Sequence, residues 1–207
     1  MGNGEVREQA DIEVRDGRIS GIGNNLQGEE VLDVEGKTVL PGFIDTHVHL
    51  MLSGEEDPYD AMKQSDDQLT LICYRNASLA LQAGFTTVCD KGARGTISLA
   101  VRDAIAEGLL PGPRLIVCGR MICMTGGHGN WLGGREADGV DECRKAAREQ
   151  LKNGADFLKI MATGGVLTRG SDPDAYQLEI EEMKAIVHEA HKVGKKTAAH
   201  AINAAGV

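Results

Sequence analysis

Polar residues that could bind a metal ion stand at the ends of short apolar segments in this sequence. His47 and His49 follow Phe-Ile-Asp, and one residue separates them. On an extended strand, residues i and i+2 project from the same face, so both imidazoles could bind one ion. The preceding residues, 41–45, predict a buried strand with both histidines facing inward. Two solvated histidines at a strand end are the alternative, and we favour the metal-ligand interpretation.

A lysine, Lys159, lies inside the apolar segment FLKIM. A buried ammonium group must lose its proton or find a partner, because burying it alone costs several kcal/mol. A Schiff-base enzyme uses such a neutral amine as a nucleophile. Reaction with CO₂ instead gives a carbamate, an anion that can bridge two metal ions. The histidine pair favours the carbamate, since a Schiff-base enzyme has no use for converging imidazoles. A lysine that only extends to solvent, or is merely buried and neutral, is the remaining alternative.

Four other residues are weaker candidates. His128 lies in the glycine-rich segment TGGHGNW, where a polar side chain suits a contact with substrate or with an oxyanion. Asp90 follows an apolar segment and suits a hydrogen-bond acceptor behind a metal ligand, although a strand cap explains it nearly as well. Arg169 and Tyr176 follow the segment around Lys159. Either could hold a substrate carboxylate, or both could be solvated loop residues.

Two further features are expected to have no catalytic role. His188 and His191 fall on one predicted helix, and His191 lies near its C-terminal end, where a positive charge suits the helix dipole. The segment 163–165, Thr-Gly-Gly, resembles a phosphate-binding loop only faintly, because a single glycine pair is weak evidence for one.

The elements that must position these residues alternate between helix and strand. At residues 81–90, 151–161 and 191–201, a helix ends at a glycine and an apolar strand follows. The pattern predicts strands near 43–48, 85–89, 114–118, 156–161 and 196–200. It predicts helices near 67–83, 96–107, 139–153 and 180–193. This alternation is typical of a parallel sheet, either open or closed as a (β/α)₈ barrel. Polar residues at the strand ends favour the barrel, whose active site lies at that rim.

The first forty residues have a different pattern. Apolar residues alternate with polar ones, and Asp16-Gly17 interrupts the alternation, which is a strong hairpin signal. The segments 31–34 and 39–40 continue the alternation. We therefore expect residues 1–41 to form a small antiparallel β unit and residues 42–207 to form the α/β unit.

Three segments resemble signatures of a known family. PGFIDTHVHL resembles the first-strand signature of the amidohydrolase superfamily, and KIMATGGVLT and TAAHA resemble its fourth and fifth strand ends. Within that superfamily the sequence is most similar to binuclear zinc carboxypeptidases, Xaa-Pro dipeptidase-like enzymes and ochratoxin-hydrolysing amidases, and TGGHGNW is part of this similarity. The resemblance implies a metal-dependent hydrolase on a (β/α)₈ barrel.

The resemblance also implies roles for particular residues. His47 and His49 would hold the more buried of two divalent ions, which we expect to be zinc. Lys159, as its CO₂-derived carbamate, would bridge the two ions, and His200 would bind the second. Residues 11–40 would form part of the small β-sandwich that members carry beside the barrel.

The chain departs from the family pattern in its length. Members have a further metal-binding histidine after the sixth strand and a proton-shuttling aspartate after the eighth, whereas this sequence stops at Val207. A complete barrel typically takes about 250 residues. We therefore expect an N-terminal fragment with about the first five barrel strands, inactive alone, and a longer parent enzyme that is a homo-oligomer.

The composition excludes several classes of function. The chain has 207 residues, with 22 Lys and Arg against 31 Asp and Glu, and 3% aromatic residues. It therefore lacks the basic stripe and the stacking platform of a nucleic-acid-binding protein. No apolar run approaches the ~20 residues of a membrane helix. Five cysteines without a C-x-x-C pair, and an N-terminus unlike a secretory signal, indicate a reducing compartment and a cytoplasmic protein.

The expected function is hydrolysis of an amide bond in a dipeptide or an N-acyl amino acid, by a hydroxide shared between two metal ions. Hydrolysis of a cyclic amide, such as a hydantoin or an imidazolone, is the alternative within the family. Two hypotheses outside it stay open. One is a Schiff-base lyase that uses Lys159 without metal, and the other is a non-enzymatic binding half-domain that needs a partner chain.

Overall fold

The chain forms two compact units. The structure is a computed structural model that describes residues 6–204 and 206–207. The first unit is Met1–Pro41 and the second is Gly42–Val207. All the candidate residues belong to the second unit. Within the described residues, no helix combines the length and the apolar character needed to cross a membrane.

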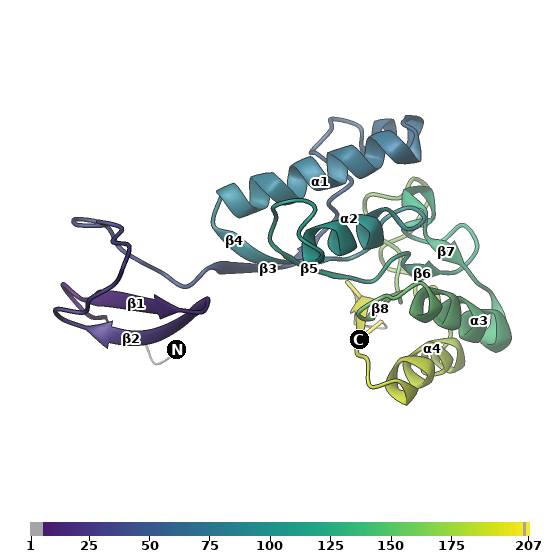
Figure 1. The fold of residues 1–207 in the computed structure, drawn as a ribbon. Coiled ribbons are helices and arrows are strands. Elements are labelled where there is room, and N and C mark those ends of the chain that lie inside the picture. The colour runs from purple at the N-terminus through teal and green to yellow at the C-terminus, as the bar shows by residue number, and fades with distance from the viewer. Residues whose placement is uncertain (1–5, 205) are drawn as a thin grey trace. The chain divides into compact units, whose positions relative to one another are not determined.

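The first unit contains the expected hairpin (Figure 1). Strand β1 (Asp11–Arg15) pairs antiparallel with β2 (Arg18–Gly23). Asp16 and Gly17, between them, have φ angles of 50° and 69°. Positive φ at both residues is the geometry of the two-residue turns that connect twisted strands. The hairpin predicted from Asp16-Gly17 is confirmed.

The predicted continuation of this β unit is wrong. No strand lies in residues 24–42, and the side chains of Val31 and Leu32 are 86% and 85% exposed. Apolar alternation produces a strand where a neighbour pairs with it and a second layer covers its apolar face. Residues 31–40 have neither a pairing strand nor a covering layer in the structure, so they form no strand despite their alternating pattern.

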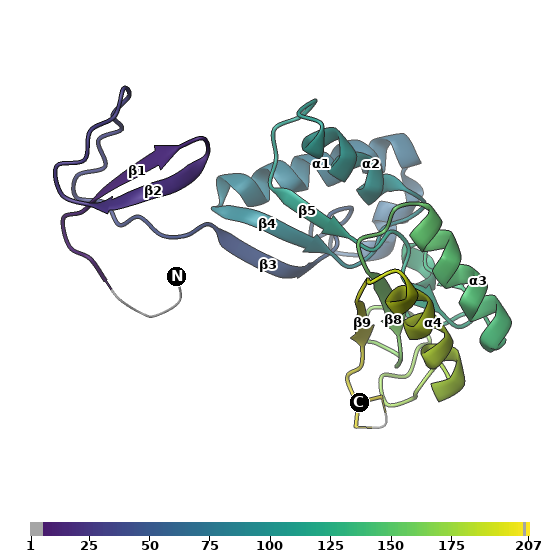
Figure 2. The same ribbon diagram turned by 60° about the horizontal axis from the view of Figure 1, so that its bottom comes forward.

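The second unit alternates strands and helices, as predicted. Its main strands are β3 (Phe43–Val48), β4 (Phe85–Asp90), β5 (Arg114–Val117), β8 (Leu158–Met161) and β9 (Thr197–His200). Its α-helices are α1 (Asp66–Gln82), α2 (Ile97–Ala106), α3 (Gly139–Lys152) and α4 (Ile180–Lys192). The strands pair in parallel, and α1 and α2 cover one face of the β3–β5 sheet (Figure 2). The predicted α/β class is confirmed.

The third strand of the series is interrupted, which the sequence pattern did not indicate. Strand β5 pairs with β4, whereas β6 (Ile122–Cys123) pairs with β8 and with β7 (Arg135–Glu136). Gly119, between β5 and β6, has a φ of 69°, and a strand cannot continue through this left-handed conformation. The described residues therefore form two open sheets, β3-β4-β5 and β7-β6-β8-β9, and no closed barrel.

Two short 3₁₀ helices lie in the loops of this unit. The helix η1 (Pro58–Lys63) precedes α1, and Asp57 caps its N-terminus by accepting a hydrogen bond from Tyr59 N. The helix η2 (Asn130–Leu132) lies between β6 and β7. The two helices contact each other, so loops that are far apart in the sequence meet.

Strand β3 is an exposed edge strand, which corrects the predicted buried one. Phe43 and Ile44 are 49% and 64% exposed, and β4 is the strand's one neighbour within the described residues. An edge strand is covered only where another element lies against it, so apolar content did not determine its burial. As a result His47 is exposed and His49 is half-buried.

The core of the second unit has two parts. In the first, α1 and α2 pack on β3, β4 and β5, and Leu69, Cys73 and Ala77 form the buried stripe of α1 at helical spacing. In the second, α3 and α4 pack on β6 and β8 through residues such as Ala146 and Ile186. All five cysteines are free thiols.

A buried carboxylate links α3 to α4. Glu189 on α4 is 4% exposed. It accepts hydrogen bonds from Arg148 Nε at 3.0 Å, from Arg148 Nη2 at 3.1 Å and from Lys192 Nζ at 3.0 Å. These bonds, that of Arg148 above all, lower the pKa of Glu189 to about 2.

We expect Glu189→Gln to lower the free energy of unfolding by about 1 to 3 kcal/mol at neutral pH, because a charged hydrogen-bonded pair is lost. The depressed pKa means that this stabilisation is complete above the ordinary carboxyl pKa and disappears as the pH falls toward about 2. Denaturant unfolding at pH 7 and again at acidic pH measures both effects. Glu181→Gln, exposed on the same helix, is the control. An equal loss in both variants would contradict the assignment.

Candidate active site

Strand β3 ends at the two histidines. The Nδ1 atom of His49 lies 2.9 Å from the carbonyl oxygen of Gly92. A carbonyl only accepts hydrogen bonds, so Nδ1 carries the proton and Nε2 keeps its lone pair. The ring centroids of His47 and His49 are 5.8 Å apart. The Nε2 atom of His49 is therefore preset to bind a cation.

Asp90, at the end of β4, supports this arrangement from behind. It is fully buried, and it accepts hydrogen bonds from Leu50 N at 2.8 Å and from Gly92 N at 3.0 Å. Burial raises the pKa of Asp90. Through the hydrogen bond from Gly92 N, Asp90 holds Gly92 in place, and the carbonyl oxygen of Gly92 orients His49. Asp90 therefore acts on His49 through the backbone.

Lys159 on β8 is 2% exposed. Burial lowers its pKa to about 8, and no carboxylate contributes to its electrostatic surroundings among the described residues. Lys159 in turn acts on His47, whose pKa is lowered to about 4, first by partial desolvation and then by the lysine charge. The amine therefore loses its proton more easily than an exposed lysine, and the His47 imidazole is neutral at pH 7.

His128 and His200 form a second pair of imidazoles, with ring centroids 4.4 Å apart. His200, at the end of β9, places Nε2 3.0 Å from the carbonyl oxygen of Gly164. Its Nε2 therefore carries the proton, and Nδ1 keeps its lone pair. His128 places Nδ1 2.7 Å from Thr168 Oγ1. Burial lowers the pKa of His128 to about 4 and also lowers the pKa of His200.

The candidate residues on β3, β8 and β9 and in the loop after β6 influence one another electrostatically. His200 and His49 lower the pKa of His128, and Lys159 lowers that of His200. The geometry shows two imidazole pairs, His47 with His49 and His128 with His200, and it places Lys159 on β8, the strand that pairs with the end of β9 at His200. Within residues 6–204 and 206–207, however, no three His, Cys, Asp or Glu side chains form a group that could hold a metal ion. The donor types suit a zinc-like ion, and the ligand set stays a prediction.

Arg169 and Tyr176 lie outside this group of side chains. Arg169 Nη2 lies 2.5 Å from Asp57 Oδ2, and its guanidinium lies 4.4 Å from the ring centroid of Tyr59. A substrate carboxylate would therefore compete with Asp57 for Arg169. Tyr176 is largely exposed and forms an isolated bridge with Thr163.

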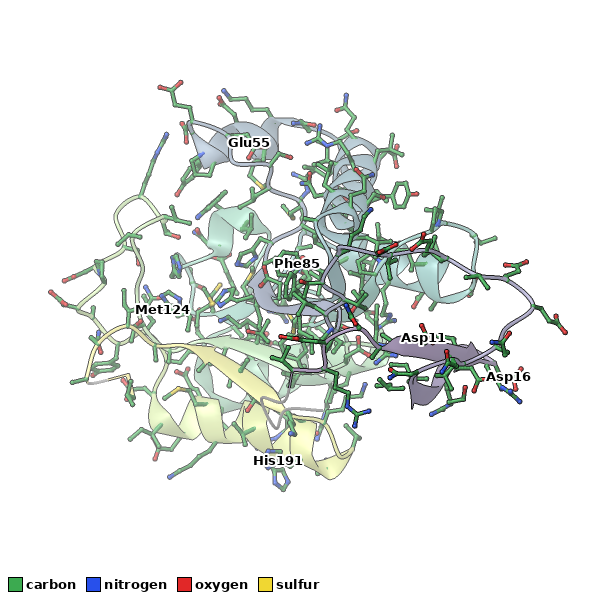
Figure 3. All side chains as sticks on the ribbon, turned by 90° about the vertical axis from the view of Figure 1, so that its left-hand side faces the viewer. Asp11, Asp16, Glu55, Phe85, Met124 and His191 are labelled. Carbon is green, nitrogen blue, oxygen red and sulfur yellow. The ribbon has the colours of Figure 1, made fainter. Side chains whose placement is uncertain are left out.

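The histidines expected to have no catalytic role are separate from the site. His188 and His191 are exposed on α4, and Figure 3 shows His191 at the surface of that helix. The Thr-Gly-Gly segment does not offer a phosphate cradle. Gly164 N donates to Ala175 O at 3.0 Å, and Gly165 N donates to Ser171 Oγ at 3.2 Å, so both amides already have partners.

Sequence reasoning missed several residues that shape the site. Thr168 contacts His128, and Trp131 stacks on Tyr59 with ring centroids 4.4 Å apart. Gly165 lies against the imidazole of His128. Thr168 and Gly165 both fall within the family-like segment KIMATGGVLT, which was the available signal. Nothing in the sequence pairs Tyr59 with Trp131.

Gly165 has no room for a side chain. A Cβ atom at this position would lie 2.4 Å from His128 Nε2, which is below any real contact. We expect Gly165→Ala to displace the His128 imidazole and to lower stability by about 1 to 3 kcal/mol. A crystal structure of the variant and its unfolding curve measure these effects. At Gly23 a Cβ would meet nothing within 4 Å, so Gly23→Ala is the control. An unmoved imidazole would contradict the expectation.

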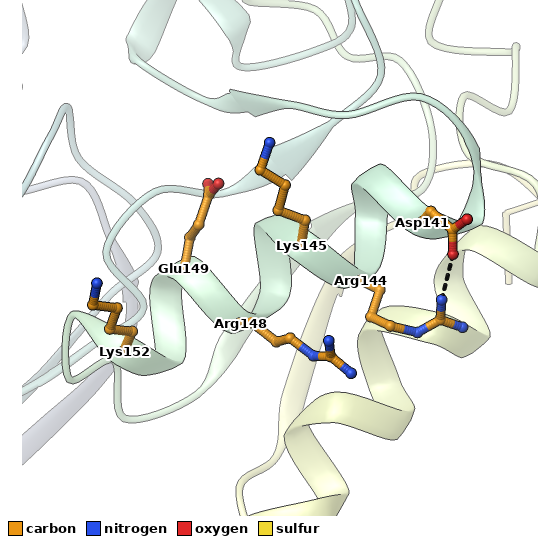
Figure 4. Close-up of a pocket in the computed structure, with 6 residues that line it drawn as sticks. All are labelled: Asp141, Arg144, Lys145, Arg148, Glu149 and Lys152. Carbon is orange, nitrogen blue, oxygen red and sulfur yellow. Dashed lines mark hydrogen bonds and ion pairs between the residues drawn. The ribbon is translucent and has the colours of Figure 1, made fainter.

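A charged depression on α3 does not belong to the site (Figure 4). It is lined by Asp141, Arg144, Lys145, Arg148, Glu149 and Lys152. Arg144 Nη1 lies 2.5 Å from Asp141 Oδ1. None of the candidate side chains lines this depression, so we assign it no chemistry.

Comparison with known proteins identifies the family to which this chain belongs. The model of the amidohydrolase family matches residues 38–207, and the chain belongs to this family. It is 31% identical to ochratoxinase from Aspergillus niger, over 82% of this chain and 40% of that protein. Members of the family generally use a binuclear metal centre. The fold is accordingly part of the amidohydrolase barrel.

Two solved structures are similar over nearly the whole chain. An amidohydrolase matches with 35% identity and a TM-score of 0.85, covering 94% of this chain and 52% of its own. A prolidase in complex with N-methylphosphonate-L-proline matches with 30% identity and a TM-score of 0.87, covering 97% of this chain and 53% of its own. The chain thus spans about half the length of the relatives it matches.

Proposed function

We propose that this chain is the metal-binding half of an amidohydrolase that cleaves the amide bond of a dipeptide or an N-acyl amino acid. The observation that carries the proposal is Lys159, a buried amine on β8 that has no carboxylate partner among the described residues and a pKa of about 8, and that acts electrostatically on His47 and His200. The similarity to ochratoxinase and to a prolidase supports an amide substrate.

Lys159 is suited to carbamate formation. Its neutral nitrogen adds to the carbon of CO₂ and releases one proton, which gives a carbamate with one negative charge. This reaction replaces a buried cation, which has no carboxylate partner among the described residues, by an anion suited to cations that the candidate histidines would hold. The low pKa makes the reactive neutral amine available near neutral pH.

The proposed metal ligands are His47, His49, His200 and the carbamate of Lys159. Two bound ions, with zinc as the expected metal, would polarise the scissile carbonyl and lower the pKa of a water molecule toward neutrality. The hydrogen bond from His49 Nδ1 to Gly92 and that from His200 Nε2 to Gly164 leave one lone pair on each ring for this purpose.

The remaining candidates would bind the substrate. His128, whose ring lies 4.4 Å from that of His200, would contact the substrate carbonyl. Arg169 and Tyr176 are candidates for the substrate carboxylate, with Arg169 exchanging Asp57 for the substrate. A cytoplasmic location, supported by the five free cysteines, and a homo-oligomeric parent enzyme complete the proposal.

A hydrolysis assay of the parent enzyme tests the proposal. N-acetyl amino acids and Xaa-Pro dipeptides are offered beside a hydantoin of similar size, before and after dialysis against a chelator. We expect cleavage of the linear amides, loss of activity after dialysis and its return with zinc. Preferential cleavage of the hydantoin would favour the cyclic-amide alternative. Activity that withstands complete metal removal would overturn the proposal.

A further inference from the structure

The hydroxyl group of Thr168 lies at the centre of a small buried network. Thr168 is 5% exposed. Its Oγ1 atom lies 3.0 Å from Gly129 N, 2.9 Å from Trp131 Nε1 and 2.7 Å from His128 Nδ1. Three nitrogen atoms therefore share one oxygen atom.

The direction of each hydrogen bond follows from the donors. A backbone N–H and an indole N–H can only donate, so Gly129 and Trp131 use both lone pairs of the Thr168 oxygen. The hydroxyl proton is the group's one remaining hydrogen-bonding capacity, and it points to His128 Nδ1. If His128 Nδ1 donated instead, three donors would meet two lone pairs, and a buried hydroxyl proton would have no acceptor.

We infer that Thr168 is a positioning residue that holds His128 as the neutral tautomer with its proton on Nε2. The Nε2–H group has no hydrogen-bond partner among the described residues, and the His128 ring lies 4.4 Å from that of His200. It is thus a fixed donor that suits a group which only accepts, such as a carbonyl oxygen or an oxyanion.

The tautomer separates the role of His128 from those of the other histidines. His49 and His200 each donate one ring proton to a backbone carbonyl and keep a free lone pair on the other nitrogen. In His128 the lone pair is occupied by Thr168, and the other nitrogen is protonated. His128 therefore has no nitrogen for a metal ion and acts as a hydrogen-bond donor.

The surroundings keep this network in place. Trp131 stacks on Tyr59 at 4.4 Å, so the indole N–H is held toward Thr168. Gly165 lies against the other side of the His128 ring, where even a methyl group would not fit. The backbone N–H of the adjacent residue, Arg169, lies 2.9 Å from Tyr59 Oη. The loop that carries Thr168 is thereby tied to η1.

Nitrogen-15 NMR of the histidine rings tests the tautomer without any substrate. The metal-free protein is labelled at histidine and measured as a solid at neutral pH. The chain has six histidines, and a His128→Gln variant identifies the His128 signals. We expect a protonated Nε2 and an unprotonated Nδ1. A protonated Nδ1 in the unmodified protein would overturn the inference.

Two variants test whether Thr168 selects the tautomer. Thr168→Val has nearly the same shape without the hydroxyl group, and Thr168→Ser keeps it. We expect the valine variant to lose the preference for Nε2–H and the serine variant to retain it. An unchanged spectrum in the valine variant would show that Thr168 does not select the tautomer. If the valine variant does not fold, the spectra of the unmodified and serine proteins still show which ring nitrogen of His128 carries the proton.

The link to catalysis rests on the proposed function and is measured separately. In the parent enzyme, Thr168→Val is expected to lower kcat about 10-fold to 10²-fold with little change in KM, because a donor to the oxyanion is misdirected, and Thr168→Ser is expected to restore it. If His128 carries its proton on Nε2 but the enzyme cleaves no amide, only the proposed function is refuted. Amide cleavage with a protonated Nδ1 would refute only this inference.

Discussion

Replacement of Lys159 by alanine is expected to lower the amide-hydrolysing activity of the parent enzyme by at least about 10²-fold, because it removes the group proposed to bridge two metal ions. Lys159 is buried and has no carboxylate partner among the described residues, so a structural ion pair is not what the change removes. Steady-state kinetics and metal content of the purified variant measure the effect. Partial recovery is expected when a short carboxylic acid is added, since its carboxylate can occupy the vacated space.

The matched control is Lys159→Arg, which keeps a cation and similar length. Arginine cannot form the carbamate, and it places a permanent positive charge where an anion is needed. We expect this variant to be inactive and to show no recovery with the carboxylic acid. Full activity of Lys159→Arg would exclude the carbamate. Covalent trapping of Lys159 by borohydride in the presence of substrate would instead support the Schiff-base alternative.

The second large effect is expected for the histidine pair on β3. The parent enzyme should contain about two equivalents of divalent metal, and the double variant His47→Asn, His49→Asn should lose most of it. The hydrogen bond from His49 Nδ1 to Gly92 prepares Nε2 as a ligand, so His49→Asn alone should cost more metal than His47→Asn alone. Elemental analysis of dialysed protein measures both.

The control for this experiment is a double variant of the same chemistry on α4, His188→Asn with His191→Asn. Both side chains are exposed on that helix, and neither contributes to the site. Metal content should be unchanged in it. Undiminished metal in the β3 double variant would refute the ligand assignment, and equal loss in both double variants would point to a general loss of folding.

The order of the elements was predictable because it depends on local patterns. The helices α1 to α4 and the strands β3, β4, β8 and β9 agree with the predicted ranges to within about two residues at each end. Three junctions, in which a helix ends at a glycine and an apolar strand follows, gave the starting points for these ranges. The hairpin was predictable for the same reason, because its turn depends on two neighbouring residues, Asp16 and Gly17. The interruption at Gly119 was not predictable, because the same glycine would also fit the end of an uninterrupted strand.

Burial was less predictable than element type. The apolar residues of β3 and of residues 31–34 predicted covered strands, yet Phe43, Ile44 and Val31 are exposed. Coverage depends on which elements lie against a strand, and these come from distant parts of the chain. The burial of Lys159 was predicted correctly, because apolar residues flank it on a strand with neighbours on both sides, β6 and β9.

By itself the sequence determined which residue types stand at the strand ends: His47, His49, Lys159 and His200 followed from local pattern and from family resemblance. The tertiary structure decided their hydrogen-bonding states. It turned His49 toward Gly92 and His200 toward Gly164, and it placed Thr168 against His128. Each of these contacts joins residues about 36 to 43 positions apart in the chain. Local periodicity carries no information at that separation, so which ring nitrogen is free could be known only once the loops had been placed in space.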